Sequence, residues 1–435
     1  MPGKPLVNLV FIGHVDHGKS TLVGRTLFES GVVSETVMKK LEEESAKVGK
    51  EHAKFAWVMD RLKDERESDQ TTDVSYRFFE TKTRAFTIID APGHRDFVKN
   101  MITGTSQADA AVLVVSAAPG QFEAGMKASA IDKSEIGGQT REHAALAFTM
   151  GIKQVIVAIN KMDTVEYSQE RYQEIKQAIT SVLQRVGFSG IEHFLFIPIA
   201  AYYGENISKP STKMPWYEGS TLLEALDTLQ EAEKPVDISL RIPVQRTFNV
   251  PGIGLLPVGR VETGIIKVGD EVVISPSGAR GRVKSMEIFH RALDKAETGD
   301  NIGISIKGLK KEDIWKGCVI GSVDNPPTVT KRFNGKIVVM EHPIGIRPGY
   351  RPVLFCHTEQ AECCIEELVS KIDPKTGGTI VNHPDLLAKG DAGIITISTE
   401  KPIVIEKVNY MPRLSRFALR DMGTTVAVGM CTDIL

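Results

Sequence analysis

The stretch that decides the fold runs Gly13-His14-Val15-Asp16-His17-Gly18-Lys19-Ser20, followed by Thr21. It matches G-x-x-x-x-G-K-[ST], the pattern of a loop that joins a strand to a helix and wraps around phosphate groups. The apolar run Val7 to Ile12 before it predicts the strand, and Ser20 to Glu29 after it predicts the helix. Glycines let backbone N–H groups approach phosphate oxygens, and the helix directs the positive end of its dipole at the same anion. We predict a phosphate-binding loop, in which Lys19 reaches the β and γ phosphates and the Ser20 hydroxyl binds Mg²⁺. A glycine-rich turn without a ligand is the alternative.

A second motif, Asn160-Lys161-Met162-Asp163, follows the apolar run Val155 to Ile159. Ligands of open α/β sheets bind at the carboxyl ends of the strands. An Asp163 carboxylate can accept from the N1–H and the amine of guanine, whereas adenine would leave it unpaired at high cost. We expect Asn160 to bond the base edge and tether the phosphate loop, and the Lys161 stem to cover one ring face. Four residues alone are a weak signal, but their place after the phosphate loop favours GTP and GDP.

A third motif, Asp90-Ala91-Pro92-Gly93-His94, closes the predicted strand Ala85 to Asp90. Asp90 is placed to hold Mg²⁺ through water, and the Gly93 N–H can meet a γ-phosphate that leaves on hydrolysis. His94 follows directly, and we expect it to orient the attacking water; a purely structural histidine is the alternative. The three motifs together predict hydrolysis of GTP to GDP and phosphate.

The first half of the chain alternates apolar runs with amphipathic stretches. This pattern predicts a P-loop α/β domain over residues 1–230, with a mostly parallel sheet and helices on both faces. Its further elements are Ala110 to Ser116, Gln154 to Asn160 and Phe194 to Pro198 as strands, and Thr140 to Met150, Ser168 to Val186 and Leu223 to Leu229 as helices. A charged segment ending at Pro235 then closes the last helix. Short Val- and Ile-rich runs punctuated by Gly predict two antiparallel β-barrels, residues 238–325 and 328–435, divided at Pro326-Pro327.

Composition sets limits on the partners. The chain has 435 residues, of which 42% are hydrophobic and 25% charged, which excludes a disordered chain. A net charge of -2 gives no overall attraction to nucleic acid, so RNA contact would need local patches. Candidate patches are Arg280, Arg282 and Lys284; Lys310 and Lys311; and Arg413, Arg416 and Arg420. Solvated faces are the alternative reading of each patch.

Two further features concern the location of the chain. No apolar run approaches the roughly 20 residues that cross a bilayer, so we expect a cytoplasmic protein without membrane contact. The five cysteines are an odd number without a CxxC pair, so most should be reduced and buried.

The three motifs, in this order and with the stretch Pro92 to Ile102, closely resemble those of the translational GTPases. Over essentially the whole chain the sequence resembles the elongation factor 1-alpha family of archaea and eukaryotes. The further matching stretches are Gly137 to His143, Leu240 to Gln245, Pro257 to Gly264, Gly299 to Gly303 and Arg416 to Met422. The resemblance implies a three-domain carrier that grips aminoacyl-tRNA with GTP, delivers it to the ribosomal A site and releases it after hydrolysis. It also implies a guanine-nucleotide exchange factor as a partner, and a monomer.

The resemblance adds site residues. Backbone N–H groups around Ala200-Ala201 would meet guanine O6, with Tyr202 next to them, and Thr71 would join Ser20 as a ligand of Mg²⁺. Three departures from the family pattern stand out: Ala200 occupies a position that is commonly Ser, Ser68-Asp69-Gln70 alters the first switch, and the 126–136 segment is longer than usual. Gln70 replaces an apolar residue that, with Val15, shields the catalytic water from His94, so we hypothesise a leakier barrier. The long segment is either a surface loop or a partner contact.

Two other functions remain open at this stage. A paralogue that carries a release factor or a ribosome-rescue factor would share the three domains and the switches. A GTPase subunit of sulfate adenylyltransferase is the other alternative, but that family usually has Ser-Val-Asp-Asp in the phosphate loop, so His14 and His17 count against it.

Overall fold

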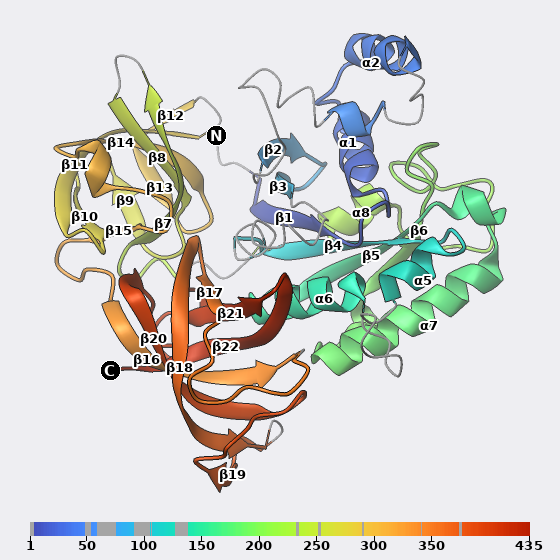
Figure 1. Ribbon diagram of the computed structural model, residues 1–435. Coiled ribbons are helices and arrows are strands. Elements are labelled where there is room, and N and C mark those ends of the chain that lie inside the picture. The colour runs from blue at the N-terminus through green and yellow to red at the C-terminus, as the bar shows by residue number, and fades with distance from the viewer. Residues whose placement is uncertain are drawn as a thin grey trace. The chain divides into compact units, whose positions relative to one another are not determined.

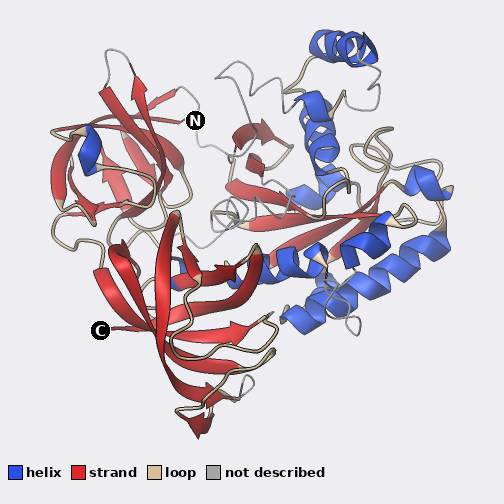
Figure 2. Cartoon of the chain, viewed as in Figure 1, coloured by secondary structure: helices blue, strands red, loops and turns tan. Residues whose placement is uncertain are grey.

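The computed structural model describes residues 4–47, 54–58, 75–90, 105, 107–126, 138–231, 235–250, 254–288, 291–340, 342–373 and 376–435. The chain divides into two compact units, Met1–Glu231 and Ala232–Leu435. Helices and strands alternate in the first unit, whereas the second consists almost entirely of strands (Figure 2).

A central sheet organises the first unit. Its described strands are β1 (Leu6–Ile12), β2 (Ser75–Glu80), β3 (Ala85–Asp90), β4 (Ala110–Ser116), β5 (Gln154–Asn160) and β6 (Leu195–Pro198), in the order β2-β3-β1-β4-β5-β6. All neighbours pair in parallel except β2, which runs antiparallel to β3 at the edge. Every residue of β4 is buried, as expected of a strand covered on both faces.

Helices lie on both faces of this sheet (Figure 1). The described helices are α1 (Lys19–Glu29), α2 (Glu35–Lys47), α5 (Gln121–Met126), α6 (Gln139–Thr149), α7 (Gln169–Val186) and α8 (Leu222–Asp227), with the 3₁₀ turns η3 (Met162–Val165) and η4 (Ile191–His193). α1 and α8 bury Leu22 and Leu226 in one core with strand residues such as Val112. The Ser168 side chain caps α7 by accepting from the Arg171 N–H, and Gly187 ends it in the left-handed conformation.

Two closed barrels form the second unit. In the first, the strands are β7 (Arg241–Val250), β8 (Gly254–Arg260), β10 (Glu271–Ser275), β11 (Ala279–Ile288), β14 (Asn301–Lys307) and β15 (Val319–Ser322). Pairing of β10 with β11 closes this ring, β12 (Arg291–Leu293) extends it, and β9 (Ile265–Lys267) pairs with β13 (Lys295–Glu297). The turn η5 (Lys311–Asp313) precedes β15.

The second barrel is built in the same way. Its strands are β16 (Val329–Val339), β17 (Val353–Cys356), β18 (Glu359–Ile372), β20 (Ala392–Val404), β21 (Arg416–Asp421) and β22 (Thr424–Ile434). Pairing of β17 with β18 closes this ring, β19 (Thr379–Asn382) extends it at β18, and the short α9 (Pro412–Ser415) precedes β21. Each barrel buries its own apolar core.

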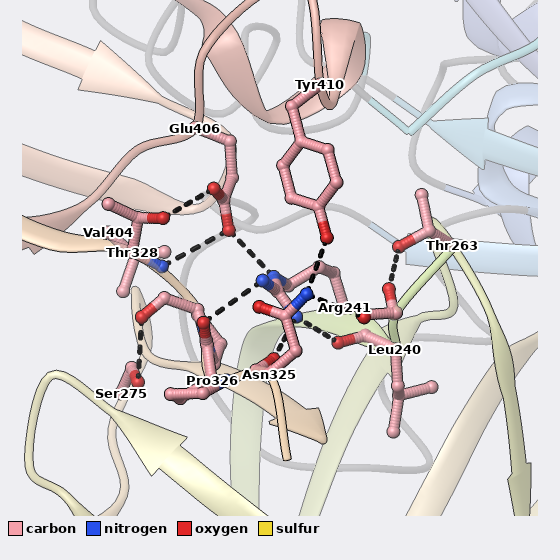
Figure 3. Close-up of polar contacts among 12 residues, drawn as sticks. Leu240, Arg241, Thr263, Ser275, Asn325, Pro326, Thr328, Val404, Glu406 and Tyr410 are labelled. Carbon is pink, nitrogen blue, oxygen red and sulfur yellow. Dashed lines mark hydrogen bonds and ion pairs between the residues drawn. The ribbon is translucent and has the colours of Figure 1, made fainter. Parts of the chain in front are cut away.

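A buried ion pair joins the two barrels (Figure 3). Arg241 of β7 donates from Nε to Glu406 Oε1 at 2.8 Å, and the two side chains are 0% and 1% exposed. The Arg241 guanidinium also donates to the backbone oxygens of Leu240, Asn325 and Pro326. Glu406 in turn accepts from the amide and the hydroxyl of Thr328. The segment Asn325 to Thr328, which connects the barrels, is therefore bonded both by the Arg241 guanidinium and by the Glu406 carboxylate.

The predicted fold class is confirmed: an α/β domain with a mostly parallel sheet precedes two antiparallel barrels. The predicted strand and helix bounds in the first unit lie within one or two residues of the observed ones, but α2, α5, the antiparallel β2 and the turns η3 and η4 were not among them. The domain limits 1–230, 238–325 and 328–435 stay a prediction. No helix in the described part of the chain is both long and apolar enough to span a membrane. All five cysteines are free and four are buried, Cys364 being half-exposed, as predicted.

Candidate nucleotide site

The predicted phosphate loop connects β1 to α1. Gly13 has φ 145°, and a Cβ there would lie 2.2 Å from the Val114 carbonyl oxygen of β4, so a side chain cannot fit. The Gly13 N–H donates to Nδ1 of His143, a fully buried residue of α6, at 3.1 Å. The start of the loop is thus pressed against β4 and held by α6.

Lys19 lies inside the loop that precedes it. Its ammonium group donates to the carbonyl oxygens of Gly13 and His14, both at 2.8 Å, and the residue is 8% exposed. Gly18, in the left-handed conformation, leads into α1, whose first turn exposes Ser20. The N–H groups at the start of a helix have no partner within it, so this loop can bind an anion with both backbone donors and an ammonium group. Of the remaining loop residues, Asp16 is exposed and Val15 and Thr21 are half-buried.

His17 packs the loop against its surroundings. Its ring is fully buried, with Nδ1 3.2 Å from the Val114 oxygen and Nε2 3.2 Å from the Gln121 oxygen. Burial is the largest influence on this imidazole and lowers its pKa to about 4, although both backbone oxygens act in the opposite direction. The ring is therefore neutral near pH 7, and it packs between the phosphate loop, β4 and α5.

Asn160 connects the phosphate loop to the segment Ala200-Ala201-Tyr202 after β6, here called the second loop. It is 2% exposed, its Nδ2 donates to the His17 oxygen at 3.0 Å, and its Oδ1 accepts from the Ala201 N–H at 3.0 Å. The tether predicted for Asn160 is therefore present, and its contact with a base edge stays a prediction. The same bond engages the Ala201 N–H, and the Ala200 N–H points to the Glu205 oxygen at 3.4 Å. The predicted role of these two amides at guanine O6 likewise stays a prediction.

Lys161 and Asp163 follow at the end of β5. Lys161 has φ 64°, and its Nζ donates to the side-chain oxygen of Gln121 at 2.9 Å. Burial lowers the pKa of this lysine, while the carboxylates of Asp16 and Asp163 oppose that shift. Asp163 is half-buried in η3, where its side chain remains accessible to a ligand. The structure thus brings Lys161 close enough to Asp163 and to Asp16 of the phosphate loop for both carboxylates to act on its charge.

Several predicted residues belong to segments that the structure does not describe. Thr71, Gly93 and His94 lie outside the described residues, as do Gln70 and positions 127–136 of the long segment. Asp90 is described as the last residue of β3, without its side chain. Among the residues that are described, no group of three or more His, Cys, Asp or Glu side chains could hold a metal ion.

Two residues that sequence reasoning missed support the site: Arg25 contacts the second loop, and Gln121 contacts Lys161 and the phosphate loop. Arg25 of α1 donates to the Tyr202 oxygen at 3.2 Å, pairs with Glu29 at 2.7 Å and lies 4.9 Å from the centre of the Phe55 ring. Tyr202 itself is half-buried, with its ring edge-on to Phe55. Gln121 is the other missed residue. Neither Arg25 nor Gln121 belongs to a recognised sequence motif, whereas His143 lies in the stretch Gly137 to His143, which resembles the family.

The predicted basic patches differ in their burial. Both residues of the second patch and all three of the first are exposed on the first barrel, so RNA contact and a solvated face both remain open for Arg280, Arg282, Lys284, Lys310 and Lys311. In the third patch Arg420 is 6% exposed and donates to the Thr425 hydroxyl and the Gly423 oxygen. Arg413 bonds Glu262 of the first barrel at 3.4 Å. Its burial and its bonds within the β21–β22 hairpin exclude both readings for Arg420. Both readings remain open for Arg413, which pairs with the first barrel, and for Arg416, which is half-buried.

Comparison with protein families covers nearly the whole chain. The model of the elongation factor Tu GTP-binding domain matches residues 4–232, elongation factor Tu domain 2 matches residues 254–321, and the GTP-eEF1A C-terminal domain-like model matches residues 332–432. Elongation factor 1-alpha of Desulfurococcus mucosus is 53% identical over 435 residues, which span 100% of this chain and 97% of that protein. Elongation factor 1-alpha of Thermoplasma acidophilum is 51% identical over 433 residues, 99% and 98% of the two chains.

Solved structures share the fold. The Ski7 GTPase-like domain of S. cerevisiae bound to GTP superposes with a TM-score of 0.79 at 17% identity and covers 99% of this chain and 98% of its own. Translation elongation factor SelB of Methanococcus maripaludis, in complex with the GTP analogue GppNHp, has a TM-score of 0.70 at 19% identity, covering 100% and 80%. At these identities the likeness concerns the fold.

Proposed function

The chain belongs to the elongation factor 1-alpha family of translational GTPases, and from this premise we propose that it carries aminoacyl-tRNA to the ribosomal A site. Family membership makes it a GTP-dependent translation elongation factor that binds GTP and GDP and hydrolyses GTP. Its curated relatives do not favour the release-factor carrier or the sulfate adenylyltransferase subunit.

The observation that supports this site most strongly is the double hydrogen bond of Asn160. One side chain holds the phosphate loop through His17 and the second loop through Ala201, so the parts that would grip phosphate and base move together. Asp163 then accepts from the N1–H and the amine of guanine, and the Lys161 stem covers a ring face. Adenine would leave that carboxylate without a donor, which costs about 1–3 kcal/mol or more when the group is buried.

The phosphates would be held by the loop from His14 to Thr21. Lys19 exchanges its carbonyl acceptors for β and γ phosphate oxygens. The exposed Ser20 hydroxyl is the hard oxygen ligand that Mg²⁺ prefers, and an ion bound mainly by phosphates and water needs few protein ligands. Mg²⁺ would neutralise charge that develops between the phosphates. Thr71 as second ligand, Asp90 through water and Gly93 at the γ-phosphate complete the proposed set.

For hydrolysis we assign His94 the orientation of the attacking water. Water attacks the γ-phosphorus in line with the leaving β-phosphate oxygen, and positioning with charge neutralisation accounts for the acceleration. The ribosome is expected to complete the site. Loss of the γ-phosphate then releases the loops that sense it, which loosens the cargo.

The base specificity can be tested with an Asp163→Asn variant. The amide of this variant keeps one acceptor and gains a donor, so it can no longer accept from both the N1–H and the amine of guanine. We therefore expect the affinity for GDP to fall about a hundredfold. Because the amide can donate to the C2 oxygen of xanthine, the affinity for xanthosine diphosphate should rise. Titration of fluorescent GDP, with the other nucleotides as competitors, measures both. Glu170→Gln, an exposed carboxylate at the start of α7, is the matched control. Unchanged GDP affinity in Asp163→Asn would refute the assignment.

The cargo can be tested by protection of the aminoacyl ester. The proposal expects the protein to slow ester hydrolysis of aminoacyl-tRNA with GTP but not with GDP. Absence of protection, together with tight binding of a release- or rescue-factor protein, would favour the alternative. We also propose a cytoplasmic monomer that uses an exchange factor, with domains at 1–230, 238–325 and 328–435.

A further inference from the structure

The first residue of α5 contacts both halves of the nucleotide site. The side-chain oxygen of Gln121 accepts from Lys161 Nζ at 2.9 Å and from the Ser116 hydroxyl at 2.9 Å. Its backbone oxygen lies 3.2 Å from Nε2 of His17 inside the phosphate loop. One residue thus meets the lysine that follows Asn160, the end of β4 and the phosphate loop.

We propose that Gln121 is a positioning residue for guanine nucleotide binding, which acts by holding the Lys161 ammonium so that the lysine stem lies along the base. This inference rests on the proposed function, because it assigns the stem to a ring face of guanine. A lysine stem has four rotatable bonds and its ammonium is strongly hydrated, so an unheld group turns toward water. The acceptor on Gln121 fixes the far end of the stem and leaves its methylene groups against the site.

The hydrogen-bond pattern defines the orientation of the amide. A lysine ammonium can only donate, so the Gln121 oxygen must face Lys161, and the Ser116 hydroxyl takes the second lone pair of that oxygen. Ser116 is fully buried and also accepts from the Ala118 N–H at 3.2 Å. The acceptor for Lys161 is therefore built from groups whose own positions are fixed by β4.

Other contacts anchor α5 without the Gln121 side chain. Glu123 accepts from the Gly120 N–H at 2.6 Å and pairs with Arg171 of α7 at 2.8 Å. Arg171 also donates to the Ala117 oxygen at 3.1 Å. A Cβ added at Gly125 would lie 2.8 Å from the His17 ring, so the helix packs directly on that imidazole. A change confined to the Gln121 side chain should leave α5 in place and alter only the lysine.

The test is a double-mutant cycle with Gln121→Leu and Lys161→Met, read as the rate of dissociation of fluorescent GDP. Gln121→Leu removes both side-chain hydrogen bonds at similar volume, and we expect dissociation to accelerate about tenfold, as for loss of a hydrogen bond to a charged group. Gln121→Glu keeps the acceptor, so its rate should stay within about twofold of the starting protein. In the Lys161→Met background, Gln121→Leu should accelerate dissociation by less than about twofold, because the hydrogen bond through which Gln121 acts is already absent.

Separate outcomes distinguish the two proposals. Equal acceleration by Gln121→Leu in both backgrounds, or no rescue by Gln121→Glu, would mean that Gln121 is only structural and would overturn the inference. An unchanged rate in Lys161→Met, which keeps an apolar stem but loses the ammonium, would also overturn the inference. An unchanged rate in Lys161→Ala, which removes the stem, would overturn the proposed role of the lysine stem as well. Glu123→Gln weakens the anchor of α5 without touching Lys161, so its effect should persist fully in the Lys161→Met background.

Discussion

Replacing Arg241 by Met should destabilise the second unit more than any surface change, because it leaves a buried carboxylate without its cation. The variant loses the bonds to Glu406 at 2.8 Å, to the Leu240 and Asn325 oxygens at 2.9 Å and to the Pro326 oxygen at 3.1 Å. Of the side-chain bonds of Glu406 to described residues, the two from Thr328 would remain. Removal of one partner from a buried ion pair costs about 3–5 kcal/mol. For a unit of roughly 200 residues this corresponds to a Tm lowered by about 10 °C.

The assay combines calorimetry with hydrogen exchange. Calorimetry measures the unfolding transition, and exchange of the amides around residues 325–328 should accelerate, since the linker loses the groups that bind it. Arg282→Met is the control: its pair with Glu271 has a similar distance, 3.0 Å, but the side chains are 65% and 64% exposed, so the cost should be about 0–1 kcal/mol. Arg241→Met combined with Glu406→Met should recover stability, because no buried charge then remains unpaired. A loss below about 1 kcal/mol in Arg241→Met would refute this account of the interface.

Three further changes test other parts of the molecule. Asn160→Ala removes both bonds that join the two loops, so GDP affinity should fall about a hundredfold in a fluorescence titration, and a loss under threefold would contradict the tether. Burial lowers the pKa of His357 to about 4 from 6.5, so the unfolded chain binds the extra proton between these values and stability should fall as pH drops from 6.5 to 4, by at most about 3 kcal/mol. His357→Gln should flatten that slope in urea unfolding series, and an unchanged slope would exclude this histidine as its source. Gln70→Val should lower unstimulated GTP turnover if Gln70 makes the barrier before His94 leaky; equal rates in a phosphate-release assay would remove the hypothesis.

Local patterns predicted the elements around the site because those elements carry strong local signals. β4 has seven consecutive apolar or small residues and β5 has an apolar run that ends at the polar Asn160, so continuous apolar runs alone bound both strands. The antiparallel β2 was not predicted because its sequence, Ser75 to Glu80, contains only two adjacent phenylalanines among polar residues and so forms no apolar run. It lies at the edge of the sheet. α2 was not predicted because few of its residues are apolar and only a few, such as Met38 and Leu41, are buried.

Long-range contacts could not be predicted from one sequence. Arg241 and Glu406 lie 165 residues apart, and neither shows a local pattern that selects the other. The same holds for Gln121 and Lys161, which meet only because β4 and β5 are neighbours in the sheet. Arg420 illustrates the opposite error, since a cluster of arginines suggests a solvated or RNA-binding face until its burial in the barrel is known.

The two carbonyl bonds of Lys19 bear on how fast a nucleotide can bind. A lysine side chain carries about 2 kcal/mol of rotamer entropy, which a flexible group would have to lose at the moment of encounter. Here that loss accompanies folding, because the ammonium is already fixed over the loop by the Gly13 and His14 oxygens. An arriving phosphate therefore meets a preorganised cation and needs only to replace one set of oxygen acceptors by another.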